Sequence, residues 1–186
     1  GSWGLPWSPS FLAFDLVTRL FSPYEFNPLN LNPLKGVLES VVDFAVLRQA
    51  DCPLKLFLSA TNVRTGRVKV FDREEICADA VLASACLPFL FHAVEIGGEA
   101  YWDGGYMGNP AIWPLIYGCR TADVVLVQIN PLTREGVPRT ALEIDNRMNE
   151  IAFNSSLMHE MRAIAFVQRL VAGGHVGSAE YKHLRL

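Results

Sequence analysis

Hydrophobic residues recur at helical spacing in several stretches of the chain. The clearest stretches are residues 10–21, 34–48 and 140–172. A run of mostly small residues at 75–86 predicts a fourth helix, buried nearly all round. The dipeptide Gly173-Gly174 suits the end of the last helix, because glycine readily takes the backbone conformations found just after a helix terminus.

Alternating apolar and polar residues predict two β-hairpins. The first joins residues 54–61 to 67–71, and the second joins 93–96 to 99–102. A further segment, residues 123–129, is apolar along almost its whole length. Such a run is typical of a strand that is covered on both faces.

Together these elements predict an α/β domain with a layered sheet. The predicted strands are too few for a complete doubly wound sheet, and none falls within residues 1–40. We therefore expect residues 1–186 to form the C-terminal part of one domain whose opening βα units are absent.

Composition and charge narrow the range of functions. The 16 Lys and Arg residues against 19 Asp and Glu residues give a net charge of −3, so a nucleic-acid partner is not expected. The four cysteines lack metal-site spacing, and neither a metal nor an organic cofactor is expected. No apolar stretch approaches the ~20 residues that cross a bilayer, so a cytoplasmic or peripheral membrane location is expected.

The segment with the clearest chemical content is Asp103-Gly104-Gly105. It follows a predicted strand directly, and functional side chains in α/β sheets gather where strands end. Two glycines after the acid permit a sharp turn and leave room for another group beside the carboxylate. An Asp held there is a candidate general base, although Asp-Gly is also a common turn dipeptide in which Asp serves only as a cap.

Other candidate residues have simpler explanations. Glu95 and Glu99 flank a Gly-Gly turn and are expected to face solvent, which argues against a carboxylate pair of the glycosidase kind. Ser84 lies on a small-residue helix, and His92 is expected at the edge of a hairpin.

Residues 78–110 resemble the second half of the patatin-like phospholipase family. In that family a helix of the form A-S-x-x-x-P precedes a hairpin that ends in D-G-G or D-G-A, and N-P follows. The matching residues here are Ala83, Ser84 and Pro88, then Asp103, Gly104 and Gly105, then Asn109 and Pro110. Residues 123–134 and 147–164 are similar to a bacterial branch of the family, and the resemblance extends over about residues 8–186.

The resemblance implies a lipid acyl hydrolase that uses a Ser–Asp dyad. Asp103 would accept the proton of the nucleophilic serine, Gly104 and Gly105 would shape the site, and an acyl-enzyme would form on the serine. The implied substrate is a lipid ester, met at a membrane or micelle surface.

The chain departs from the family pattern in one respect. It contains no G-x-S-x-G nucleophile motif and no Gly-rich oxyanion loop before residue 60. We therefore expect the nucleophile to lie in a missing N-terminal segment, in the same or another chain, and residues 1–186 alone to be inactive. The alternative is a non-catalytic patatin-like module that binds lipid or a partner.

Overall fold

The computed structural model describes residues 13, 16–18, 20–176 and 184. Its helices and strands are, in chain order, α2 (Pro23–Phe26), α3 (Pro33–Val41), α4 (Phe44–Arg48), β1 (Leu58–Asn62), β2 (Val68–Phe71), α5 (Ala78–Ser84), β3 (Val94–Ile96), β4 (Glu99–Asp103), the 3-10 helix η2 (Gly104–Tyr106), α6 (Trp113–Gly118) and α7 (Ala141–Ala172). The predicted helix at 10–21 lies largely outside the described residues.

The strands form one antiparallel sheet with the order β2-β1-β4-β3. Both predicted hairpins are present, and the pairing of β1 with β4 joins them by placing Ala60 opposite Asp103. The first strand begins at Leu58, four residues later than the alternation predicted. The sheet and its helices confirm the expected α/β class.

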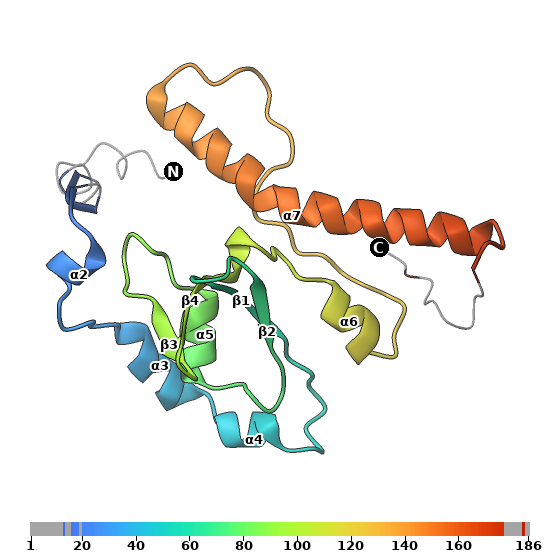
Figure 1. Cartoon of the computed structure of the whole chain (residues 1–186), viewed down its shortest axis with the longest axis horizontal. Coiled ribbons are helices and arrows are strands. Elements are labelled where there is room, and N and C mark those ends of the chain that lie inside the picture. The colour runs from blue at the N-terminus through green and yellow to red at the C-terminus, as the bar shows by residue number, and fades with distance from the viewer. Residues whose placement is uncertain (1–12, 14–15, 19, 177–183, 185–186) are drawn as a thin grey trace.

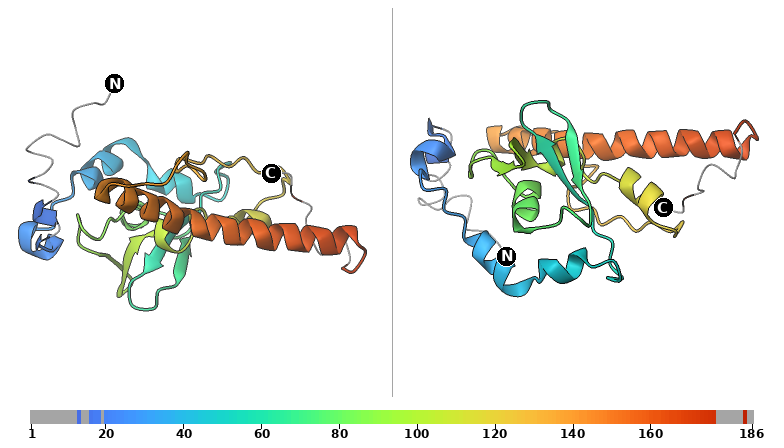
Figure 2. Two further views of the ribbon diagram at one scale, coloured as in Figure 1. Left: turned by 90° about the horizontal axis from the view of Figure 1, so that it is seen from above. Right: turned by 60° about the horizontal axis from the view of Figure 1, so that its bottom comes forward.

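Helix α5 packs on the sheet and forms the main core with it. The buried residues of this core are Ala60, Phe71, Ile76, Ala80, Ala83 and Tyr101. Three of the six are alanines, which allow the helix backbone to approach the sheet closely. Helices α3 and α4 lie beyond α5, on the opposite side of the sheet from α7 (Figures 1 and 2).

The predicted single helix over residues 34–48 is two helices, α3 and α4. The break falls at Val42-Asp43, where the Asp43 side chain accepts hydrogen bonds from the N–H groups of Ala45 and Val46. An Asp that can cap a new helix competes with continuation of the old one, because its carboxylate satisfies N–H groups that the break exposes.

Helix α7 confirms the predicted long helix but not its predicted buried face. It begins at a capping box formed by Thr140 and Glu143 and ends at Gly173. Its buried residues are Glu150, Asn154, Leu157 and Ile164, whereas the hydrophobic stripe expected to face the core includes the exposed residues Ile144, Met148 and Ile151. The buried face therefore starts polar and becomes apolar toward the C-terminal half, where Leu157 and Ile164 pack with Ile112 and Leu184.

Residues 123–129 do not form the predicted buried strand. They are extended, but only Asp123 makes a bridge, and no backbone hydrogen bond joins residues 124–129 to another described segment. Val124 and Leu126 pack toward Ile112 and Leu157. The opposite face is open: Val125 is 90%, Val127 84% and Ile129 91% exposed. The segment has the composition of a covered strand but lacks a covering layer on one side.

Candidate active site

The backbone of Asp103 is fixed where β4 ends. Its N–H donates to the carbonyl of Cys86 at 2.9 Å, and its own carbonyl accepts a hydrogen bond from the Thr61 hydroxyl at 2.8 Å. The residue is thereby tied both to the end of α5 and to strand β1. This arrangement places the candidate base at the end of an interior strand of the sheet, as the sequence predicted.

The Asp103 side chain makes one hydrogen bond within the described residues. Its Oδ1 accepts a hydrogen bond from the Gly105 N–H at 2.7 Å, which makes Asp103 the N-cap of η2. The turn-cap explanation is therefore correct for one oxygen. Within the described part of the chain, no other group hydrogen-bonds this carboxylate, so it keeps capacity to accept a further proton donor.

Burial raises the pKa of the Asp103 carboxyl above its usual value, and the Gly105 N–H opposes that shift by stabilising the charged form. The side chain is half-buried. Burial and the nearby Asp103 charge also raise the pKa of Tyr106. A carboxylate whose charge is poorly solvated holds a proton more readily, which is the property required of a general base.

The two glycines after Asp103 are required by close packing. A Cβ at Gly104 would lie 2.5 Å from the Ser59 carbonyl carbon and overlap its oxygen. A Cβ at Gly105 would lie 2.5 Å from the ring of Phe153. Neither glycine has a positive φ, so the need is for space. The space that side chains at these two positions would fill is occupied by strand β1 at Gly104 and by helix α7 at Gly105.

Helix α7 braces the loop that follows Asp103. The backbone N–H of Asn109 donates to the Ser156 hydroxyl at 2.8 Å, and the Asn109 side chain donates to the Phe153 carbonyl at 3.2 Å. One helical turn further on, Glu160 accepts a hydrogen bond from the Ile112 N–H at 2.7 Å. Sequence reasoning missed these α7 residues as parts of the site, because a contact between segments some 50 residues apart leaves no local pattern.

None of the described residues supplies a nucleophile bonded to Asp103. Cys86 lies close by, but burial raises the pKa of its thiol to about 11, and its Sγ–H donates to the His92 carbonyl at 3.2 Å. The Ser59 hydroxyl donates to the Gly108 carbonyl at 3.0 Å. His92 stacks on Tyr24, with the two ring centroids 4.0 Å apart. Its ring therefore packs against Tyr24 and is not positioned as a partner of Asp103.

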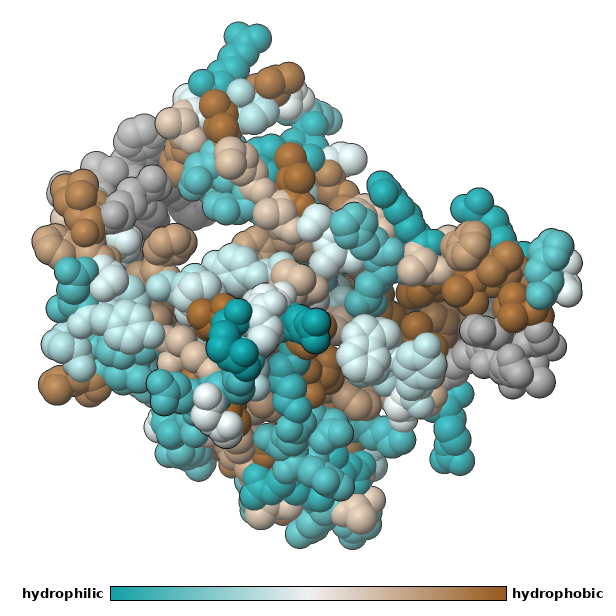
Figure 3. Space-filling view, in the orientation of Figure 1, coloured by the Kyte–Doolittle hydropathy of each residue, from teal (hydrophilic) through white to brown (hydrophobic). Residues whose placement is uncertain are grey.

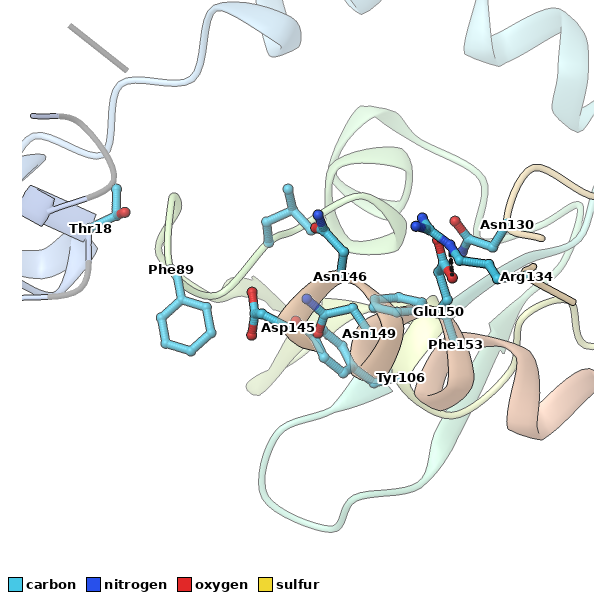
Figure 4. A pocket seen from close by; sticks show the side chains of 11 residues that line it. Thr18, Phe89, Tyr106, Asn130, Arg134, Asp145, Asn146, Asn149, Glu150 and Phe153 are labelled. Carbon is cyan, nitrogen blue, oxygen red and sulfur yellow. Dashed lines mark hydrogen bonds and ion pairs between the residues drawn. The ribbon is translucent and has the colours of Figure 1, made fainter. Parts of the chain in front are cut away.

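A cavity of about 890 Å³ adjoins the Asp103 loop. Its lining combines apolar and polar side chains, drawn in Figure 4: Thr18, Leu87, Phe89, Tyr106, Asn130, Arg134, Asp145, Asn146, Asn149, Glu150 and Phe153. Tyr106 and Phe153 connect the cavity to Asp103, since Tyr106 belongs to the 3-10 helix that Asp103 caps and Phe153 packs on Gly105. The space-filling view shows the molecule hollowed on this face (Figure 3).

The family assignment agrees with this geometry. A sequence model of the family described as patatin-like phospholipase matches residues 4–116, more than half of the chain, and the match includes Asp103, Gly104 and Gly105. The chain belongs to the patatin-like phospholipase family, a family of lipid acyl hydrolases. No curated protein matches the chain. Segment 123–129 and helix α7 lie beyond the matched residues.

Across the described residues, no group of His, Cys, Asp and Glu side chains is arranged to hold a metal ion. The helices in this part of the chain include none with the length and apolar character needed to cross a bilayer.

The packing around Gly104 predicts a large asymmetry between two Gly→Ala changes. Gly104→Ala forces a methyl group against the backbone of Ser59, and we expect a loss of about 1–3 kcal/mol in the free energy of unfolding. Gly36→Ala, in α3 with nothing within 4 Å of the added atom, is the matched control and should be neutral or stabilising. Chemical denaturation measures both; equal effects would contradict the close approach of β1.

The raised pKa of Asp103 predicts a pH-dependent effect of Asp103→Asn on stability. The folded chain holds this proton more readily than the unfolded chain, so the wild type loses stability relative to the variant as pH rises through the folded pKa. In thermal unfolding, Asp103→Asn and the wild type should have nearly equal stability at about pH 3. The variant should become the more stable of the two as the pH rises toward about 7. The opposite result would be that Asp103→Asn is less stable than the wild type near neutral pH and that this difference in stability disappears in acid. That result would show that the carboxylate is stabilised in its charged form.

Proposed function

We propose that the chain provides the acid half of a Ser–Asp dyad in a lipid acyl hydrolase, with Asp103 as the proton acceptor. One observation carries the proposal: a half-buried carboxylate at a strand end accepts a hydrogen bond from a single backbone N–H, in a loop whose Tyr106 lines a cavity of about 890 Å³. The family assignment supports the same chemistry.

In the proposed reaction the serine gives its hydroxyl proton to Asp103 while its oxygen attacks the ester carbonyl carbon. The tetrahedral intermediate collapses, the lipid alcohol leaves with the proton from Asp103, and an acyl-enzyme remains. Water then gives a proton to Asp103, attacks the acyl-enzyme and releases the fatty acid, and the serine recovers its proton. The elevated pKa of Asp103 favours each proton acceptance.

We propose further that the segment with the nucleophile covers the open face of residues 123–129. That face presents three almost fully exposed aliphatic side chains, Val125, Val127 and Ile129, next to backbone groups that are unpaired within the described residues. An apolar segment of this kind, with unpaired backbone groups, is suited to pairing with a strand and to cover by a helix. The segment is already anchored to α7, because the Gln128 side chain donates a hydrogen bond to Asn154 Oδ1 at 3.3 Å.

Contact with a lipid surface is supported by apolar residues near the start of the described chain. Leu20, Phe21, Tyr24, Leu29 and Leu31 are all exposed. Two of these residues, Phe21 and Tyr24, are aromatic and are 50% and 57% exposed. Exposed apolar side chains close together in the sequence suit a membrane or micelle interface.

The role of Asp103 predicts a specific loss of activity in the protein that contains the nucleophile segment. Asp103→Asn should lower kcat/KM for a chromogenic butyrate ester by about 10²–10⁴-fold, because the serine loses its proton acceptor. Glu95→Gln, an exposed carboxylate on the neighbouring strand β3, is the control and should retain the wild-type rate. If Asp103→Asn stays near the wild-type rate, the assigned role is wrong.

The incomplete site predicts that the 186-residue chain does not hydrolyse this ester by itself. Addition of the segment that carries a G-x-S-x-G motif, covalently or as a second chain, should restore turnover, and Val127→Lys should weaken that restoration by placing a charge in the docking face. Turnover by the purified chain alone would contradict the divided site. A segment whose motif lacks the serine would identify the non-catalytic binding module.

A further inference from the structure

The Asp103 carboxylate has no charged partner among the described residues. The titratable groups that interact with it are the Cys86 thiol, just after α5, and the Tyr106 phenol in η2. Burial raises the pKa of both groups, so both are uncharged at neutral pH. Strand β1 contributes the Thr61 hydroxyl, which donates to the backbone carbonyl of Asp103. On α7, the carboxylate of Glu150 is paired with two arginines. The environment of Asp103 is therefore set by how far its neighbours exclude water.

On the Gly105 side of the carboxylate, one side chain of α7 excludes water. The position that a Cβ of Gly105 would take lies 2.5 Å from the Phe153 ring and 3.1 Å from Asp103 Oδ1. The ring and the carboxylate oxygen thus flank the same point, which is too close to the ring for a water molecule. Phe153 therefore shields the charge of Asp103 from solvent on this side, because an aromatic ring cannot solvate a carboxylate as water does.

Phe153 is held in this position by contacts with the loop after β4. Its ring packs against the Tyr106 ring, with the two centroids 5.4 Å apart (Figure 4). Its backbone carbonyl accepts a hydrogen bond from the Asn109 side chain at 3.2 Å. One turn later on α7, the Ser156 hydroxyl accepts a hydrogen bond from the Asn109 N–H at 2.8 Å. The contacts that fix the loop on α7 therefore also fix the ring beside the carboxylate.

We propose that Phe153 is a positioning residue for Asp103: its ring keeps water from one side of the carboxylate and holds η2 against α7, so that Oδ1 stays on the Gly105 N–H and Oδ2 remains for the serine hydroxyl. The inference rests on the proposed function, because it concerns the proton transfer proposed for Asp103. It also extends the site beyond residues 4–116, which match the family model, since Phe153 lies on a helix outside that match. Without the ring, water would solvate the charged carboxylate and make it a weaker proton acceptor.

Titration of the Asp103 carboxyl by carbon-13 NMR in the 186-residue chain tests the shielding directly. Phe153→Ala should lower the pKa of Asp103 toward that of an exposed aspartate, because water then reaches the charged form. Phe153→Gln should lower this pKa as well, and it serves as the second variant where Phe153→Ala folds poorly. Phe166→Ala, at a phenylalanine of the same helix that is 61% exposed, is the control and should leave the pKa of Asp103 unchanged. The same pKa in the wild type and in the Phe153 variants would overturn the proposal.

A double-mutant comparison in chemical denaturation tests the contact itself. Gly105→Ala places a methyl group where the ring of Phe153 lies, so it should destabilise the wild type more than it destabilises Phe153→Ala. Gly104→Ala is the control and should destabilise both backgrounds equally, because its methyl group meets Ser59. Equal effects of Gly105→Ala in the two backgrounds would also overturn the proposal.

In the protein that contains the nucleophile segment, the pH profile of kcat/KM measures the catalytic consequence. The rate falls in acid as Asp103 becomes protonated. In Phe153→Ala this fall should move to lower pH, and the plateau rate should decrease about three- to tenfold because the base is weaker. A purely structural role of Phe153 would lower the plateau and leave the pH of the fall unchanged, which would contradict the positioning role.

The proposed dyad and the role of Phe153 fail in different experiments. Full activity of Asp103→Asn would refute the dyad and leave the NMR result standing. An Asp103 pKa that does not respond to Phe153, together with an inactive Asp103→Asn, would refute only the role of Phe153.

Discussion

The site depends on the way three segments converge on two glycines. Strand β1 approaches Gly104 so closely that no side chain fits, and Phe153 of α7 does the same at Gly105. Between them the Asp103 carboxylate is half-buried and held by one backbone N–H. Partial burial without a cationic partner raises its pKa, and that combination makes this Asp a candidate proton acceptor as well as a turn cap.

The sequence predicted most of what surrounds this point. Alternation gave both hairpins, and the strand end with its Asp-Gly-Gly turn gave the candidate base. These features are local, so a short window of residues specifies them. The break at Asp43 was missed because the periodicity continues through it, and only the capping side chain interrupts the helix.

The contacts of α7 were beyond prediction for a different reason. Its hydrophobic stripe suggested a conventional buried face, but the helix buries Glu150 and Asn154 against the 128–134 segment instead. A buried carboxylate is tolerated there because two arginines pair with it. Charged residues that are buried through long-range partners look solvent-exposed in a sequence, so neither Glu150 with its arginine partners nor Phe153 was foreseen.

Under the proposed function, segment 123–129 and the cavity are two parts of one site that a further segment would complete. One is an apolar segment without cover on one face, and the other is a hollow lined by Tyr106, which lies in the loop whose Asp103 carboxylate has spare hydrogen-bonding capacity. A single additional element could pair with segment 123–129, cover its open face and bring a hydroxyl to Asp103. The proposal thus accounts for the exposed aliphatic face of segment 123–129 and for the single hydrogen bond of the Asp103 carboxylate together.

Labelling with a fluorophosphonate probe tests the dyad most directly, because the probe reacts covalently only with an activated serine. In the protein that includes the nucleophile segment, we predict labelling of one serine in that segment at a rate that falls steeply when Asp103 is replaced by Asn. Labelling that is equally fast in the Asn variant, or labelling of a serine within residues 1–186, would contradict the account.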